Sequence, residues 1–202
     1  DFIAALSVEG SGEAMLRSMD RVTSGIHRHT QEMVRAICFF FFVALWTLGG
    51  ILLTPELTSK SLLLPPLQLL IAVCLLWRRT LPISALGIVV LFGMAIHDYG
   101  IFHLADYPIF LGIAAYLALS GLQKTFFRIE PIDIMRYATA VTLMWASVEK
   151  WAYPQWSFPM FITHPNITFG FEPEFYMRAA GAVEFTLAFA LLWTPLVRRC
   201  AA

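Results

Sequence analysis

The sequence predicts an all-α membrane protein with six transmembrane helices. Apolar residues make up 58% of the 202 positions and charged residues only 14%, whereas soluble domains are about half apolar and a quarter charged. Apolar segments also recur along the chain at nearly the length that a bilayer requires, which is roughly 20 residues per helix. The composition and the segment lengths together indicate that membrane lipid surrounds the chain. The formal net charge of zero gives no indication of a nucleic-acid partner.

The first 34 residues form the only polar stretch of the chain. Apolar residues recur there at helical spacing beside arginines, which predicts a basic amphipathic helix lying on the cytoplasmic membrane surface. The residues that carry this pattern are Met15, Met19, Val22 and Ile26 with Arg17, Arg21 and Arg28. Residues 35–202 are then expected to form a single transmembrane domain.

Six apolar segments follow, each interrupted by proline, glycine or charged residues. Pro65 and Pro66 lie at the start of the second segment, where a missing backbone N–H is tolerated, so they indicate a helix start. The predicted spans are 36–53, 62–77, 81–97, 108–122, 134–150 and 175–197.

The distribution of positive charge predicts the orientation. With six spans, 11 of the 14 Lys and Arg residues fall on one side, and only Lys60, Lys150 and Arg178 fall on the other. Because positive residues are enriched in cytoplasmic loops, both termini are expected in the cytoplasm and the protein in an inner (plasma) membrane.

This topology collects polar residues at the outer end of spans three and four. His97, His103 and Asp106 have the ligand atoms of a metal site, but sharing a metal requires the helix to end near Gly100. Two other interpretations are open: His97 and Asp98 hydrogen-bond a quinone or another substrate, or these are ordinary interfacial residues. A haem is not expected, because only His97 lies near a span and a b-type haem needs axial histidines inside the spans.

Glu184 is predicted to lie near the middle of the bilayer, about ten residues into the last span. A carboxylate at that depth is a functional hypothesis by default. Gly181 and Ala188 share its face, so we expect Glu184 to point into the bundle along a stripe of small residues. The alternative is a protonated side chain that only links two helices.

Glu149 and Lys150 end the fifth span and begin the longest outer loop, residues 151–174. Either one of them faces the bundle interior or both extend to the surface. A Glu149 and Glu184 pair at one cavity could relay protons. Trp151 opens a loop rich in aromatics and prolines, which is typical of a segment at the membrane interface.

Residues 133–197 resemble the DoxX-like superfamily of small membrane proteins. The resemblance rests on Arg136 opening a span, the segment 145–151 closing it, Pro159 in the outer loop and the segment 181–184 in the last span. It implies a four-helix bundle of spans three to six, a role linked to quinone or thiol redox chemistry, and functional positions at Glu149, Lys150 and Glu184. Known members include the membrane subunits of a thiosulfate:quinone oxidoreductase and partners of extracytoplasmic redox enzymes.

The leading functional hypothesis is a DoxX-like protein that handles a quinone or a small redox substrate in the outer half of the membrane. Glu184 would accept a proton, Lys150 or His97 would hydrogen-bond a quinone oxygen beside Asp98 and Trp151, and Arg136 would anchor the inner end. The alternative is a non-catalytic accessory subunit of a larger membrane complex, favoured by the short second and fourth spans. Small-solute transport is a third and less favoured interpretation, because no predicted span is interrupted by glycine or proline at its midpoint, as the spans of transporters are.

Overall fold

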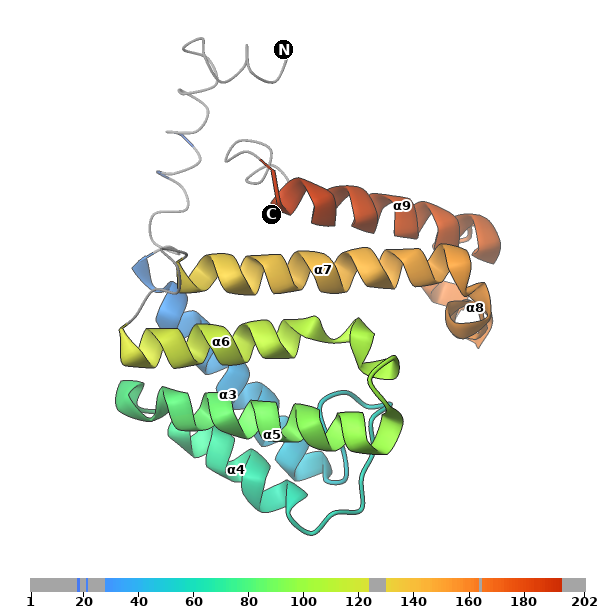
Figure 1. Cartoon of the computed structure of the whole chain (residues 1–202). Helices are drawn as coiled ribbons and strands as arrows, with labels where there is room; N and C mark the ends of the chain where they lie inside the picture. The colour runs from blue at the N-terminus through green and yellow to red at the C-terminus, as the bar shows by residue number, and fades with distance from the viewer. Residues whose placement is uncertain (1–17, 19–20, 22–27, 124–129, 164, 194–202) are drawn as a thin grey trace.

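The computed structural model describes residues 18, 21, 28–123, 130–163 and 165–193, and its regular structure is helical (Figure 1). Within these residues the only β pairing is an isolated bridge between Ile51 and Thr58. Each of the six predicted apolar segments overlaps one α-helix, so the predicted helical class is confirmed. The elements are α3 (Thr30–Leu48), α4 (Leu64–Cys74), η1 (Arg78–Thr80), α5 (Leu81–Tyr99), η2 (His103–Asp106), α6 (Pro108–Leu122), α7 (Pro131–Ala152), α8 (Pro154–Thr163), η3 (Pro165–Thr168) and α9 (Pro173–Leu191).

Proline sets the start of most helices. Pro65 and Pro66 lie in the first turn of α4 as predicted, because that turn leaves its N–H groups without intrahelical partners. Five further α-helices also carry a proline in their first turn: α5, α6, α7, α8 and α9.

The first predicted span is displaced toward the N-terminus. It was expected over 36–53, but α3 ends at Leu48, because Gly49 and Gly50 take positive φ angles of 69° and 71° and turn the chain. Leu52 and Leu53 then fold back into the core, so their hydrophobicity reflects burial in a loop. The Gln68 side chain on α4 secures this loop by donating from Nε2 to the Ile51 carbonyl at 2.5 Å.

The other end of α3 also changes the predicted boundary at residue 34. The helix begins at Thr30, and Val34 already packs against the core cluster one turn before the buried Cys38. Apolar spacing on one face therefore continues through the predicted boundary. Of the predicted amphipathic segment, Met15, Arg17, Met19, Val22 and Ile26 lie outside the described residues.

The helices α5, α6, α7 and α9 lie side by side in chain order, and each runs antiparallel to the next (Figure 1). α4 packs against α3 and α5, and α3 crosses behind α5 and α6. α9 packs against α7, α8 and η3, so spans three to six form a row and do not close into the compact four-helix bundle that the resemblance implied. α3 begins and α9 ends at the same end of the row.

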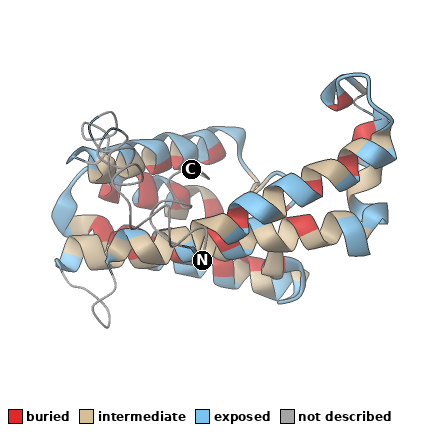
Figure 2. Cartoon of the chain, turned by 90° about the horizontal axis from the view of Figure 1, so that it is seen from above, coloured by how far each residue is buried: buried red, intermediate tan, exposed pale blue. Residues whose placement is uncertain are grey.

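Most of the buried core lies in α3 to α6. One apolar cluster joins these helices and the loop after α3, whereas the buried side chains of α7 are Ala140 and Ser147 and those of α9 are Met177, Gly181 and Ala188. Figure 2 shows buried residues in short patches, separated by exposed and half-buried turns. The pair α7 and α9 therefore packs closely but buries few large apolar side chains.

In the part of the chain that the structure describes, two helical segments are long and apolar enough to cross a membrane by length and composition. These are Thr30–Leu48 and the continuous stretch Arg78–Tyr99. α4 and α6 are apolar but have only 11 and 15 residues, and α7 and α9 are long enough but not apolar enough. Two of the six predicted spans thus meet the requirement by themselves.

The packing of α6 on α7 depends on Gly112. A Cβ atom at this position would lie 2.2 Å from the Ala138 Cβ and 3.5 Å from the Met135 Cα. Ala138 has no longer side chain to move aside, so any side chain at position 112 must push the two helices apart. Gly93 on α5 provides a matched control, since a Cβ there would meet no atom within 4 Å.

Replacing Gly112 with alanine is expected to destabilise the protein by roughly 1–3 kcal/mol, the usual cost of overpacking a close contact. The Gly93→Ala variant should be neutral or slightly more stable, because alanine favours the helix. Thermal unfolding in mild detergent measures both. Equal stability of the two variants would show that α6 and α7 are not in close contact.

Candidate functional site

A group of polar side chains surrounds a cavity of about 550 Å³ between η2, α7 and α8, here named the α7–α8 cavity. This volume lies within the range of small-molecule sites. Its lining combines three carboxylates, one lysine and one histidine with four aromatic rings. The lining residues are Glu56, Phe102, His103, Asp106, Tyr107, Glu149, Lys150, Trp156, Ser157 and Phe161.

Four separate parts of the chain supply this lining. Glu56 comes from the α3–α4 loop, and His103 and Asp106 lie on η2, which forms because Gly100 ends α5 at a φ of 85°. Glu149 and Lys150 lie in the last turn of α7. α8 folds over the cavity and contributes Trp156, so the predicted interfacial loop 151–174 contains a helix that forms one wall.

Aromatic contacts order the wall of the cavity. The Phe102 ring lies edge-on to Trp145 at 6.1 Å and to Trp156 at 6.4 Å between ring centroids. Tyr153 stacks on Trp156 at 4.6 Å. Such pairs link α8 to α7 and to the residue before η2 through apolar surface, so aromatic rings stand beside the carboxylates in the cavity wall.

Asp106 lies among several polar groups of the cavity. Burial raises the pKa of its carboxyl above the ordinary value of 3.8, and the charge of Glu56 adds to this, while the neighbouring Glu149, Trp145 and His103 act in the opposite direction. Burial also raises the pKa of Tyr107 to about 12. The Tyr107 hydroxyl therefore stays protonated and donates to Glu56 Oε2 at 3.1 Å.

Two buried polar atoms beside the cavity have no hydrogen-bond partner in the described part of the chain. They are Asp106 Oδ1, an acceptor, and Trp145 Nε1, a donor. The two side chains are near each other, but no hydrogen bond of ordinary geometry joins them. Buried polar groups are nearly always paired, so these two atoms, which are closed to solvent, are an unmet acceptor and an unmet donor next to the cavity.

Glu184 faces α7, as the stripe of small residues predicted. Its Oε2 lies 2.6 Å from Lys150 Nζ, and Lys150 Nζ also donates to the Ala146 carbonyl at 3.3 Å. The Lys150 side chain is only 15% exposed and that of Glu184 is 37% exposed. Glu184 therefore pairs with Lys150 and not with Glu149, which lies beside Asp106.

Gly181 lets α9 approach α7 at this pair. A Cβ there would lie 2.9 Å from Trp151 Nε1 and 3.4 Å from the Lys150 Cβ. The Trp151 Nε1–H donates to the Arg178 carbonyl at 3.2 Å, and the Trp151 ring packs on Phe185. Trp151 thus joins α7 to α9 and does not line the α7–α8 cavity.

The structure places the remaining predicted site residues elsewhere. His97 and Asp98 pair at 2.9 Å and line a second hollow of about 430 Å³ with Ser59, Ser61, Gly93 and Met94. The predicted metal ligands His97, His103 and Asp106 are thereby separated, and the described residues contain no group of three or more His, Cys, Asp or Glu that could hold a metal ion. Arg136 lies near the other end of α7, where it pairs with Asp133 at 2.5 Å.

Sequence reasoning missed several members of the site. Glu56 lies in a short loop without periodicity, and Tyr107 and Trp145 have the ordinary composition of an interfacial belt. The only signal in the sequence was the proximity of aromatic residues to carboxylates. Tyr107 directly follows Asp106, and Trp145 lies one helical turn before Glu149.

Comparison of the chain with protein-family models, with curated proteins and with solved structures finds no match.

Proposed function

We propose that the chain is a six-span integral membrane protein of DoxX-like type whose α7–α8 cavity binds a quinol. Both termini would lie in the cytoplasm, and the cavity would lie in the outer half of an inner (plasma) membrane. The observation that carries the proposal is the cavity itself, in which hydrogen-bond acceptors stand beside flat aromatic surface.

Insertion in a membrane is supported by the apolar residues that the fold leaves uncovered. On α5, Ile83, Leu86 and Val90 recur at helical spacing and are 48%, 64% and 44% exposed. The opposite face of the same helix is buried in the core, so the helix is apolar on all sides, which is typical of a membrane span. Contiguous apolar surface of this kind marks a membrane or a protein interface.

The polar lining favours the reduced, hydroxyl-bearing form of a quinone. Glu56, Asp106 and Glu149 offer carboxylate oxygens, which accept hydrogen bonds, while the Lys150 ammonium is already engaged by Glu184. A quinol has two O–H donors on a planar ring. Its ring would lie against Phe102 and Trp156, with its hydroxyls donating to Asp106 and Glu149.

The same placement suits quinol oxidation by a redox partner. A quinol that becomes a quinone loses two protons and two electrons. Asp106 and Glu149 would accept the protons, and an oxidised redox protein docked at this face would accept the electrons. A thiol substrate is less favoured, because Cys38 and Cys74 are free, buried on α3 and α4 and absent from the cavity lining.

Binding of decylubiquinol to the purified protein, followed by tryptophan fluorescence, tests this proposal. Glu149→Gln should weaken binding about tenfold or more, because hydrogen bonds to charged groups contribute roughly 1.5–3 kcal/mol. The control is His97→Gln in the second hollow, which should bind normally. No saturable binding, or weakened binding in the control alone, would refute the site.

The second candidate is a non-catalytic accessory subunit, favoured by the partial exposure of Glu184. Among the described residues, the main contacts of α9 are with α7, α8 and η3, and a carboxylate 37% exposed within a predicted span is costly beside lipid. A partner helix would cover it. Sizing of the protein in mild detergent, with identification of co-purifying chains, distinguishes this role, since quinol binding by the isolated chain would contradict it.

A further inference from the structure

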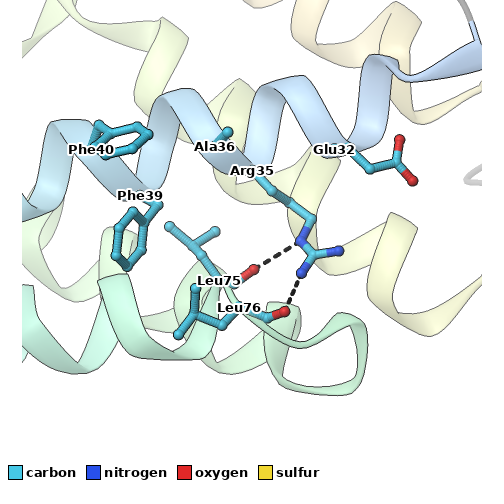
Figure 3. A pocket seen from close by; sticks show the side chains of 7 residues that line it. All are labelled: Glu32, Arg35, Ala36, Phe39, Phe40, Leu75 and Leu76. Atoms are coloured by element: carbon cyan, nitrogen blue, oxygen red, sulfur yellow. Dashed lines mark hydrogen bonds between the residues drawn. The ribbon is translucent and has the colours of Figure 1, made fainter.

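A groove between α3 and α4, at the end of the molecule where α3 begins, combines a cation with apolar walls. Its volume is about 260 Å³, and it is here named the α3–α4 groove. Figure 3 shows Arg35 reaching from α3 to the end of α4, with Phe39 and Phe40 farther along α3. The lining residues are Glu32, Arg35, Ala36, Phe39, Phe40, Leu75 and Leu76.

Arg35 is fixed in this groove by the carbonyl groups that follow α4. Its Nε donates to the Leu75 carbonyl at 2.8 Å, and its Nη2 donates to the Leu76 carbonyl. Carbonyls at a helix end lack intrahelical partners, and a cation there is favourable. These two bonds use two of the five guanidinium N–H donors, so three remain for an anion.

Glu32 does not neutralise this cation. No ion pair between Glu32 and Arg35 is formed in the described structure, and Figure 3 shows the Glu32 carboxylate directed away from the guanidinium. Arg78 and Arg79 follow Leu76 by two and three residues and are both exposed. The two chain segments that border the groove, residues 32–40 and 75–79, contain three arginines and one glutamate and so carry a formal charge of +2.

The other walls are apolar and open to the surroundings. Phe40 is 69% exposed and Leu76 is 49% exposed, and the adjoining Trp77 is 58% exposed. In the proposed orientation this region faces the cytoplasmic leaflet, where tryptophan and arginine meet lipid headgroups. A ligand with an anionic head and an apolar tail matches both ends of the groove.

We propose that the α3–α4 groove binds one anionic phospholipid of the cytoplasmic leaflet. Its phosphate accepts hydrogen bonds from Arg35, and an acyl chain lies along Phe40 and Leu76. Because the two segments that border the groove carry net positive charge, they repel the choline cation of a zwitterionic lipid, so an anionic headgroup without that cation is preferred. This inference rests on the proposed membrane insertion, but it does not depend on quinol binding.

Retention of lipid by the full chain, measured by native mass spectrometry in detergent, tests the inference. Delipidated protein is titrated with phosphatidylglycerol or phosphatidylcholine, and one tightly bound phosphatidylglycerol is expected. The double variant Arg78→Gln/Arg79→Gln leaves the Arg35 contacts with α4 in place and should weaken phosphatidylglycerol binding roughly 30-fold. Phe40→Ala should weaken both lipids, and the control Lys60→Gln, at the opposite end of α4, should change neither.

Three outcomes would overturn the inference. These are equal affinity for the two lipids, unchanged binding in the double arginine variant, and equally tight binding of glycerol phosphate, which has no acyl chain. Decylubiquinol binding by the same samples separates the two proposals, because loss of quinol binding with retained lipid selectivity would refute only the α7–α8 cavity.

Discussion

Replacing Lys150 with methionine should destabilise the protein by roughly 2–4 kcal/mol, the largest effect expected from a single charge. The change leaves Glu184 without its partner at the contact between α7 and α9, and removing one member of a buried pair costs more than the pair contributes. The upper part of the usual range does not apply, because that range describes fully buried pairs and the protein buries this pair only in part. Unfolding in detergent at neutral pH measures the loss.

A double-mutant cycle with Glu184→Gln separates the pair from its surroundings. The double variant should recover much of the stability, because no unpaired charge remains. Arg178→Met is the matched control, since Arg178 and Glu174 form an ion pair at 2.6 Å on α9 with side chains 68% and 51% exposed. That change should cost below about 1 kcal/mol, and equal losses at both pairs would show that the Lys150 pair is not sheltered.

Replacing Asp106 with asparagine should weaken decylubiquinol binding about tenfold or more while making the empty protein more stable at neutral pH. Burial raises the pKa of Asp106 in the folded protein, so the folded state binds this proton more tightly than the unfolded state does. Protonation of Asp106 therefore stabilises the fold when the pH is below the ordinary pKa of 3.8. This stabilisation is lost as the pH rises through the pKa of Asp106 in the folded protein.

At neutral pH the raised pKa of Asp106 makes the folded wild-type protein less stable than it would be with an ordinary carboxyl at this position, and asparagine removes this cost. The difference between the two proteins should disappear as the pH falls toward 4. Asp98→Asn is the control, because Asp98 lies in the second hollow and its change should alter stability by less than about 0.5 kcal/mol. If the Asp106→Asn protein were less stable than the wild type at neutral pH, the predicted direction of the stability change would be wrong.

The sequence predicted the helical segments well, because proline and glycine mark their ends. The segment 108–122 agrees with α6 at both ends, and Pro65 and Pro66 begin α4 as expected. The end of α3 was wrong, since Leu52 and Leu53 are as apolar in a buried loop as they would be in a span. Composition alone does not distinguish these two forms of burial.

The site was predicted in part. Helical spacing was enough to direct Glu184 toward α7, because Gly181 and Ala188 mark the face that packs closely. It was not enough to separate His97 from His103, since the turn after Gly100 sends the two histidines to different hollows. Glu56 reaches the cavity from a loop about 90 residues before Glu149, and such a contact depends on the packing of several helices.

Photoaffinity labelling with an azidoquinol tests the central claim most directly, because it reports where the ligand lies. The account predicts adducts on η2, on the end of α7 and on α8, within residues 102–107 and 145–161, and their loss when excess decylubiquinol is added. Adducts concentrated at residues 93–98, or adducts that excess quinol does not displace, would contradict it.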